Sequence, residues 1–292
     1  MSEKINKTFQ EIFNRVPFPI LRAAKLLYRY PRYSRALKEG RLKYAEFLGK
    51  YTHNILFVAG LPKSGTTWLE NMLTGFPGYT IIPDPAITVH DYRFGGTHHY
   101  DIDPKYFNDL KNALALVKIH AHGSRHNIDL LHDAGIPYCI MYRDLRDAAV
   151  SYVYYVKRTP WHPEYPVYKQ LDIKTGLYCF GQKLLPEWRD WVQGWLVNRD
   201  PEKSLVLRYE DLLKDSEMEF LKVAEFYDLP NARVKDIVER NKFTKLRGKS
   251  SFYRKGSSGD WRNHFDHQIS DLYKSQISSF LIEHGYESDE NW

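Results

Sequence analysis

The feature that most constrains the fold of this chain is residues 54–76, where an apolar run leads through a glycine-containing loop into a helical pattern. "NILFVAG" (54–60) is typical of a buried strand, and "TTWLENMLTGF" (66–76) is typical of a helix. A strand, a tight turn and a helix start aim several backbone N–H groups at one anion, and the helix dipole adds to the attraction. The arrangement predicts a loop that binds a phosphate or a similar anion.

The lysine of this loop does not stand where ATP-binding loops have it. Those loops read G-x-x-x-x-G-K-[ST], and Gly60 and Gly65 have the same separation. However, Thr66 follows the second glycine, and the nearest lysine, Lys63, lies inside the loop. From there it can lie beside the oxygen that bridges a phosphate and its outer group, where charge develops as the bond breaks. The alternative is a Gly-Ser turn before a core helix that binds no ligand.

Three further apolar runs end in polar residues and predict strands at 113–120, 138–144 and 204–211. Helical patterns lie between or after them, at 144–157, 176–197, 210–227 and 232–240, and 247–265 is expected to be a surface loop. This alternation predicts an α/β fold, a P-loop-like parallel β-sheet flanked by helices on both faces, in a single domain. Functional residues then belong at the carboxyl ends of the strands, which carry Lys63, His120, Arg143 and Tyr209.

The positive charge of the chain is concentrated at its start. Residues 1–53 hold twelve Lys or Arg against four Asp or Glu, so the net charge of +6 leaves residues 54–292 slightly negative. That balance argues against nucleic-acid binding. Residues 20–51 read as two basic amphipathic helices broken near Pro31, which either contact an anionic membrane or pack on the domain formed by 54–292. With neither a signal peptide nor a long apolar run, we expect a cytoplasmic protein.

"PKSGTTWLE" (62–70) resembles the 5′-phosphosulfate loop of sulfotransferases that use 3′-phosphoadenosine 5′-phosphosulfate (PAPS) as sulfuryl donor. The resemblance implies that PAPS is the donor, that 3′,5′-diphosphoadenosine (PAP) is the product, and that no metal is needed. It also implies that Lys63 stabilises the leaving phosphate, with Ser64, Gly65, Thr66 and Thr67 around that group.

Two more stretches resemble the part of the family's site that holds the 3′-phosphate. "YRDLRDAAVSY" (142–152) has an arginine and a serine, Arg143 and Ser151, at the family's spacing, although a surface arginine and a helix-face serine are common. "FYRKGSSGDWRNHF" (252–265) is similar to the family's R-K-G-x-x-G-D-W loop. The contacts implied by this second stretch come from Phe252, Tyr253, Arg254, Lys255 and Gly256.

"LVKIHAHGS" (116–124) is similar to the family's K-x-H strand end, which implies that His120 is the catalytic base and that Lys118 assists it. The two lie two residues apart, so they share a strand face. His122 competes for the same role, and a lone histidine is more often structural than catalytic.

Adenine contacts are implied for Trp68, Tyr209 and Phe243. Asn241 stands two residues before that phenylalanine, where the family usually has Thr or Ser; an asparagine side chain can still hydrogen-bond a purine edge. The family's dimer motif is also altered, to Arg262, Asp266, His267 and Asp271, which leaves the oligomeric state open.

The acceptor is the least constrained part of the prediction. Aromatic residues of segments 78–107 and 152–170 favour a small aromatic or lipid-like acceptor. Polar groups in the first segment would suit a carbohydrate instead; they are His90, Asp91, His98 and His99. The alternatives to a sulfotransferase are a P-loop nucleotide kinase and a non-catalytic protein that binds a nucleotide or an anionic lipid.

Overall fold

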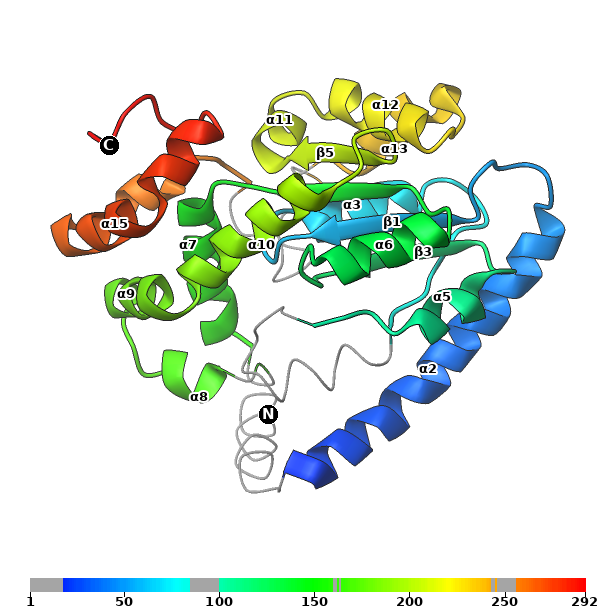
Figure 1. The fold of residues 1–292 in the computed structure, drawn as a ribbon, viewed down its shortest axis with the longest axis horizontal. Helices are drawn as coiled ribbons and strands as arrows, with labels where there is room; N and C mark the ends of the chain where they lie inside the picture. Colours follow the sequence, from blue (N-terminus) through cyan, green and yellow to red (C-terminus); the bar gives the residue numbers. More distant parts are fainter. Residues whose placement is uncertain (1–17, 85–99, 160–161, 163, 243–244, 246–255) are drawn as a thin grey trace.

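The protein is described by a computed structural model, which covers residues 18–84, 100–159, 162, 164–242, 245 and 256–292; for residues 18–26 and 28 the backbone alone is described. Its strands form one parallel sheet in the order β2-β3-β1-β4-β5 (Figure 1). They are β1 (Ile55–Gly60), β2 (Thr80–Ile81), β3 (Ala115–Ile119), β4 (Tyr138–Tyr142) and β5 (Ser204–Arg208). The predicted α/β fold with a parallel sheet is confirmed.

Helices cover both faces of the sheet (Figure 1). One face carries α6 (Arg125–Asp133), α7 (Leu145–Lys157), α9 (Ile173–Lys183), α10 (Leu185–Asn198) and α15 (His267–Glu283). The other carries α3 (Thr66–Leu73), α11 (Tyr209–Lys214), α12 (Ser216–Phe226) and α13 (Val234–Arg240), the last preceded by the 3-10 turn Asn231–Arg233. Successive side chains of β1 alternate between the faces: Phe57 packs in the first core, and Leu56 and Val58 pack in the second.

Two of the predicted helices are each divided in the structure. The pattern at 176–197 corresponds to α9 and α10, which are separated at Leu184 because Pro186 stands in the first turn of the new helix. The pattern at 210–227 corresponds to α11 and α12, separated at Asp215, whose carboxylate accepts from the Met218 N–H and begins the new helix. Two short helices, α5 (Pro104–Leu110) and α8 (Tyr165–Tyr168), also occur in the described ranges.

The predicted break near Pro31 is wrong, because α2 runs without interruption from Phe18 to Glu46. Proline removes one helical hydrogen bond, and the carbonyl left without a donor belongs to Leu27, a residue that is 76% exposed. The Tyr33 hydroxyl joins the helix to α5 by donating to the Asp109 carboxylate at 2.9 Å. The Gly40 carbonyl accepts from the N–H of Leu114, the residue just before β3. The boundary between 1–53 and 54–292 stays a prediction. Among the described helices, none is long and apolar enough to cross a membrane.

The expected surface loop 247–265 is described from residue 256 on; residues 256–258 are irregular and partly exposed, but the turn that follows them is packed on the domain. The 3-10 turn η2 (Asp260–Asn263) lies against α7, and Asp260 and Trp261 are buried. The cause is Asp147 of α7, which accepts hydrogen bonds from the N–H groups of Gly259 at 2.7 Å and Trp261 at 3.0 Å.

Candidate active site

The loop between β1 and α3 depends on a glycine that no other residue can replace without strain. Gly65 has φ 82°, and a Cβ there would lie 2.6 Å from the ring of Tyr209. Lys63 also adopts a left-handed conformation, with φ 65°. Because α3 begins at Thr66, the first N–H groups of the helix have no intrahelical acceptor and point into the loop.

Two side chains of this loop, those of Ser64 and Lys63, are also suited to binding an anion. Ser64 is fully buried, and no described residue accepts or donates a hydrogen bond at its Oγ. The ammonium of Lys63 lies over the ring of Tyr155 from α7, 3.9 Å from its centroid. A buried hydroxyl and a lysine held over an aromatic face fit a sulfuryl or phosphoryl group in this loop.

His120 follows β3 directly and is fixed against the same loop. Its Nδ1 lies 2.5 Å from the Gly60 carbonyl oxygen. A carbonyl can only accept, so Nδ1 carries the proton and Nε2 carries the lone pair of a general base. Its backbone carbonyl accepts from Trp191 Nε1 at 2.9 Å, which anchors the strand end.

The surroundings of His120 keep its ring neutral. The pKa of His120 is lowered to about 4, chiefly by burial; the hydrogen bond to Gly60 opposes the shift, and the charges of Lys118 and Lys63 add to it. An imidazole with such a pKa is unprotonated at neutral pH, as a base must be.

The competing histidine has another environment. His122 Nδ1 lies 3.1 Å from the Tyr100 carbonyl, and its own carbonyl accepts from Asn127 of α6. His122 thus contacts Tyr100 and Asn127, whereas His120 contacts Gly60 in the anion loop. This geometry favours His120 over His122 as the base.

Lys118 projects toward α3 and pairs with a residue that the sequence analysis did not single out. Its Nζ lies 2.7 Å from Glu70 Oε2 and 3.4 Å from Thr67 Oγ1. The lysine therefore borders the anion loop, as expected, but shares its charge with an acidic partner. Glu70 stands within the loop motif itself, although nothing in the motif shows which cation it meets.

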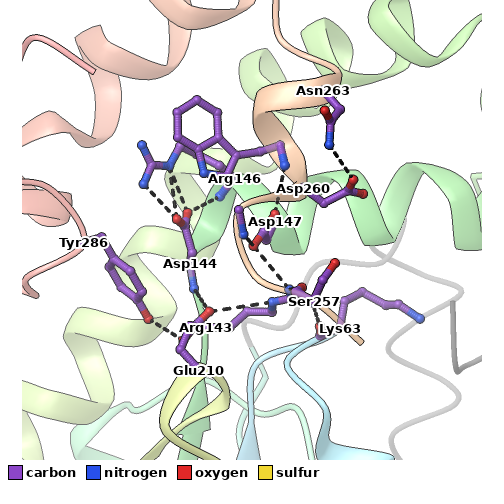
Figure 2. A network of polar contacts seen from close by, with 12 residues as sticks. Lys63, Arg143, Asp144, Arg146, Asp147, Glu210, Ser257, Asp260, Asn263 and Tyr286 are labelled. Atoms are coloured by element: carbon purple, nitrogen blue, oxygen red, sulfur yellow. Dashed lines mark hydrogen bonds and ion pairs between the residues drawn. The ribbon is translucent and has the colours of Figure 1, made fainter. Parts of the chain in front are cut away.

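Arg143, at the end of β4, lies beside the loop on the side away from His120. It is 7% exposed, and its Nη1 donates to the Lys63 carbonyl at 3.2 Å while Nη2 donates to the Ser257 carbonyl at 3.3 Å (Figure 2). Its Cζ lies 4.2 Å from the centroid of the Tyr209 ring. No described residue accepts a hydrogen bond from its Nε.

Two carboxylates accompany Arg143. Asp147 Oδ2 lies 3.5 Å from its Nη2, and Glu210 Oε1 lies 4.0 Å from its Nε. Burial raises the pKa of both carboxyls, and the guanidinium opposes the rise. Ser151 lies one helical turn beyond Asp147 on α7, so it shares the face that Asp147 turns toward Arg143. The spacing of four between Arg143 and Asp147 was a signal in the sequence that could have identified this pair.

Trp68 and Tyr209, two of the aromatic residues predicted to contact adenine, are buried. Trp68 is 4% exposed, its Nε1 donates to the Asn241 carbonyl at 2.8 Å, and its ring lies edge-on to Tyr209 at 6.4 Å. The side-chain amide of Asn241 donates to the Ile237 carbonyl at 2.9 Å. The adenine contacts of Trp68 and Tyr209 remain predictions.

Gly256 is described, with φ 64°, at the start of the turn whose Ser257 meets Arg143. The remaining members of the predicted site lie outside the described residues; they are Phe243, Phe252, Tyr253, Arg254 and Lys255. The same holds for four polar candidates for acceptor binding, His90, Asp91, His98 and His99.

A family model described as the sulfotransferase domain matches residues 53–281, most of the chain and every element that builds this site. The chain belongs to the sulfotransferase domain family. Among curated relatives, this sulfotransferase is 26% identical to guinea pig sulfotransferase 1E1 over 77% of the chain and 85% of the relative. It is 32% identical to rat sulfotransferase 1 family member D1 over 42% of the chain, an alignment that spans 47% of that relative.

Solved structures agree with this assignment at the level of the fold. A mouse sulfotransferase solved with PAP superposes with a TM-score of 0.60 at 18% identity, covering 85% of this chain and 95% of that one. A retinol dehydratase solved with retinol and PAP gives a TM-score of 0.57 at 20% identity, covering 78% and 81%. The predicted family membership is confirmed, and the nucleotide kinase alternative is not favoured.

Proposed function

We propose that this protein transfers a sulfuryl group from PAPS to a hydroxyl or an amine of a small acceptor. The observation that carries the proposal is the placement of three functional groups around one loop. His120 binds the Gly60 carbonyl, Arg143 binds the Lys63 carbonyl, and the loop between these contacts begins α3. A base on one side and an arginine on the other fit a donor that carries a transferable group at one phosphate and a second phosphate elsewhere.

The site offers a role to each of these residues. Bound PAPS supplies an activated sulfuryl group. His120 Nε2 takes the proton of the acceptor hydroxyl, and the buried, uncharged ring has the form that this step requires. Lys63 and the N–H groups at the start of α3 stabilise negative charge on the departing phosphate. Arg143 and Ser151 hold the 3′-phosphate, with Arg254, Lys255 and Gly256 as the predicted closing residues.

The fit of the nucleotide rests on unused donors of the described residues. Arg143 Nε and Ser64 Oγ are buried polar atoms without a hydrogen-bond partner among those residues. Ser64 lies within the loop between β1 and α3, and Arg143 follows the neighbouring strand β4, so the two positions fit a ligand with two anionic groups. No cluster of three potential metal ligands occurs within the described ranges, and metal independence stays a prediction.

For the acceptor, we favour a small aromatic or lipid-like alcohol over a carbohydrate. Tyr155 presents its ring beside Lys63, so an aromatic face adjoins the position where transfer would occur. Retinol and androsterone occur with PAP in the retinol dehydratase structures, and both are apolar alcohols. A cytoplasmic location is part of the same proposal.

The test is formation of PAP from PAPS in the presence of EDTA, with phenol, sterol, amine and sugar acceptors in separate reactions. We expect PAP formation that depends on the acceptor and is about 10²–10⁴-fold slower in His120→Asn. PAP formation that requires Mg²⁺, or none with any acceptor class while PAP still binds, would instead support the kinase or the non-catalytic alternative.

Membrane contact through α2 is a second candidate, supported by the face of this helix that points away from the domain. Leu27 and Leu42 are 76% and 64% exposed, and Arg35 and Lys38 are exposed between them. Exposed leucines among cations fit a surface of anionic lipid. In a sedimentation assay at low salt, the wild-type protein should bind phosphatidylserine-containing vesicles and Leu42→Ser should not. Equal binding of the wild type to neutral vesicles would contradict this interpretation.

A further inference from the structure

Arg146 is a buried charge that the proposed reaction does not use. It is 1% exposed, and its Nε and Nη2 donate to the carboxylate of Asp144 at 3.0 and 2.8 Å (Figure 2). On its other side, Nη1 lies 2.6 Å from Glu287 Oε1. Because removal of one member of a buried ion pair leaves an uncompensated charge, this group holds the segments that it joins firmly together.

Two tryptophans enclose the same guanidinium. Its Cζ lies 3.9 Å from the ring centroid of Trp261 in η2 and 4.5 Å from that of Trp292. The two indole rings meet edge to face at 5.4 Å. Because the two ring centroids are only 5.4 Å apart, the indoles contact the guanidinium on adjacent sides and not on its two opposite faces. Arg146 thus joins the start of α7 to η2 and to residues 284–292, the segment that follows α15.

One connection leads from this cluster to Arg143 through η2. Trp261 donates its N–H to Asp147 Oδ1 at 3.0 Å, and Asp147 Oδ2 lies 3.5 Å from Arg143 Nη2. Ser257, three residues before η2, has a backbone carbonyl that accepts from Arg143 Nη2 at 3.3 Å. The indole that Arg146 contacts therefore belongs to a turn that bonds Asp147 and directly follows the segment in contact with Arg143.

A second connection leads through Asp144 and Glu210. The Asp144 N–H donates to Glu210 Oε1 at 3.0 Å, the oxygen that lies 4.0 Å from Arg143 Nε. Tyr286, in the segment that follows α15, donates to the other oxygen of Glu210 at 3.2 Å (Figure 2). Both carboxylates that flank Arg143 are thus held by groups in contact with Arg146 or with the segment that it binds.

We propose that Arg146, which contacts the rings of Trp261 and Trp292, is a positioning residue for the 3′-phosphate subsite. It fixes η2 and residues 284–292 against α7, and so sets the orientation of the Arg143 guanidinium. The inference rests on the proposed function, because it assigns the 3′-phosphate of the donor to Arg143. Its consequence is selectivity: Arg146 supports binding of a nucleotide with a 3′-phosphate and has little influence on one that has only a 5′-phosphate.

The test compares the affinities for PAP and for 5′-AMP, measured by calorimetry, in Arg146→Met, Arg146→Lys, Trp292→Leu and Trp292→Phe. Loss of one hydrogen bond between charged groups corresponds to about tenfold in affinity. We therefore expect Arg146→Met and Arg146→Lys to weaken PAP about tenfold or more and 5′-AMP less than about twofold. Trp292→Leu should show a smaller loss of the same kind, and Trp292→Phe, which retains an aromatic face, should bind as the wild type does.

The matched control is Arg189→Met. Arg189 Nη1 donates to the Gln276 carbonyl at 3.0 Å and joins α10 to α15, two helices that do not carry Arg143 or its carboxylate partners. We expect it to lower the melting temperature without changing the ratio of the two affinities. An unchanged ratio in Arg146→Met, or an equal loss for both ligands, would overturn the proposal. If Arg146→Met does not fold, an unchanged ratio of the PAP and 5′-AMP affinities in Trp292→Leu would overturn the proposal. A wild-type protein without preference for PAP would instead refute the proposed function itself.

Discussion

Replacement of His120 by Asn tests the electrostatic basis of the proposed mechanism. The pKa of His120 in the folded protein is about 4, against 6.5 for the unfolded chain, with burial as the largest cause. The unfolded state therefore binds a proton between these two pH values and the folded state does not. Stability is complete above pH 6.5 and falls as the pH is lowered toward 4, by at most about 3 kcal/mol. The neutral asparagine removes this dependence.

The assay is urea unfolding of the wild type and of His120→Asn at several pH values from 4 to 8. Groups with shifted pKa elsewhere, such as Asp147, are present in both proteins and cancel in the difference. We expect the two stability curves to run parallel above pH 6.5 and to converge or cross below it. Imidazole NMR should show one resonance that titrates near pH 4 and is absent from the variant. Curves that stay parallel down to pH 4, with a His120 resonance titrating near pH 6.5, would refute the reasoning.

Three other predictions concern the loop and the sheet behind it. Lys63→Ala should lower kcat by about 10²–10³-fold with PAP affinity changed only a few-fold, because the ammonium acts on charge that develops during transfer; an equal loss of affinity would contradict this role. Gly65→Ala should abolish PAP binding and destabilise the protein, because the new Cβ would lie 2.6 Å from the Tyr209 ring at a residue with φ 82°. Calorimetry with PAP and thermal unfolding test this prediction, and wild-type affinity and stability would contradict it. Tyr227→Phe removes a buried hydroxyl that bridges β1 and β4, so stability should fall by about 1–3 kcal/mol with kcat unchanged; an altered kcat would be the contrary result.

Much of the fold could be predicted because its main strands are apolar runs that end where polar residues begin. The four predicted strands exist, but β2 has two residues, too few for any pattern. The division of α11 from α12 depends on Asp215 as a cap, which a helical pattern does not register. The helix α2 continues through Pro31, although a proline in a helical pattern locally predicts a break.

The site could be predicted where its residues fall in short motifs and not where they meet across the fold. Lys63, His120 and Arg143 stand in such motifs, and the structure brings them to one loop. The partner of Lys118, the role of Asp147 and the enclosure of Arg146 by Trp292 each join residues far apart in the sequence. Such contacts depend on how helices pack, so local pattern and residue type do not determine them.

The measurement that tests the central claim most directly is calorimetry of the wild-type protein without metal, with PAP, 5′-AMP and, in the presence of Mg²⁺, ATP. The arrangement of Lys63 and Arg143 around one loop predicts tight binding of PAP and much weaker binding of 5′-AMP and ATP. Equal affinity for PAP and 5′-AMP, or preference for ATP with Mg²⁺, would contradict the assignment of this site to a donor with phosphates at both positions.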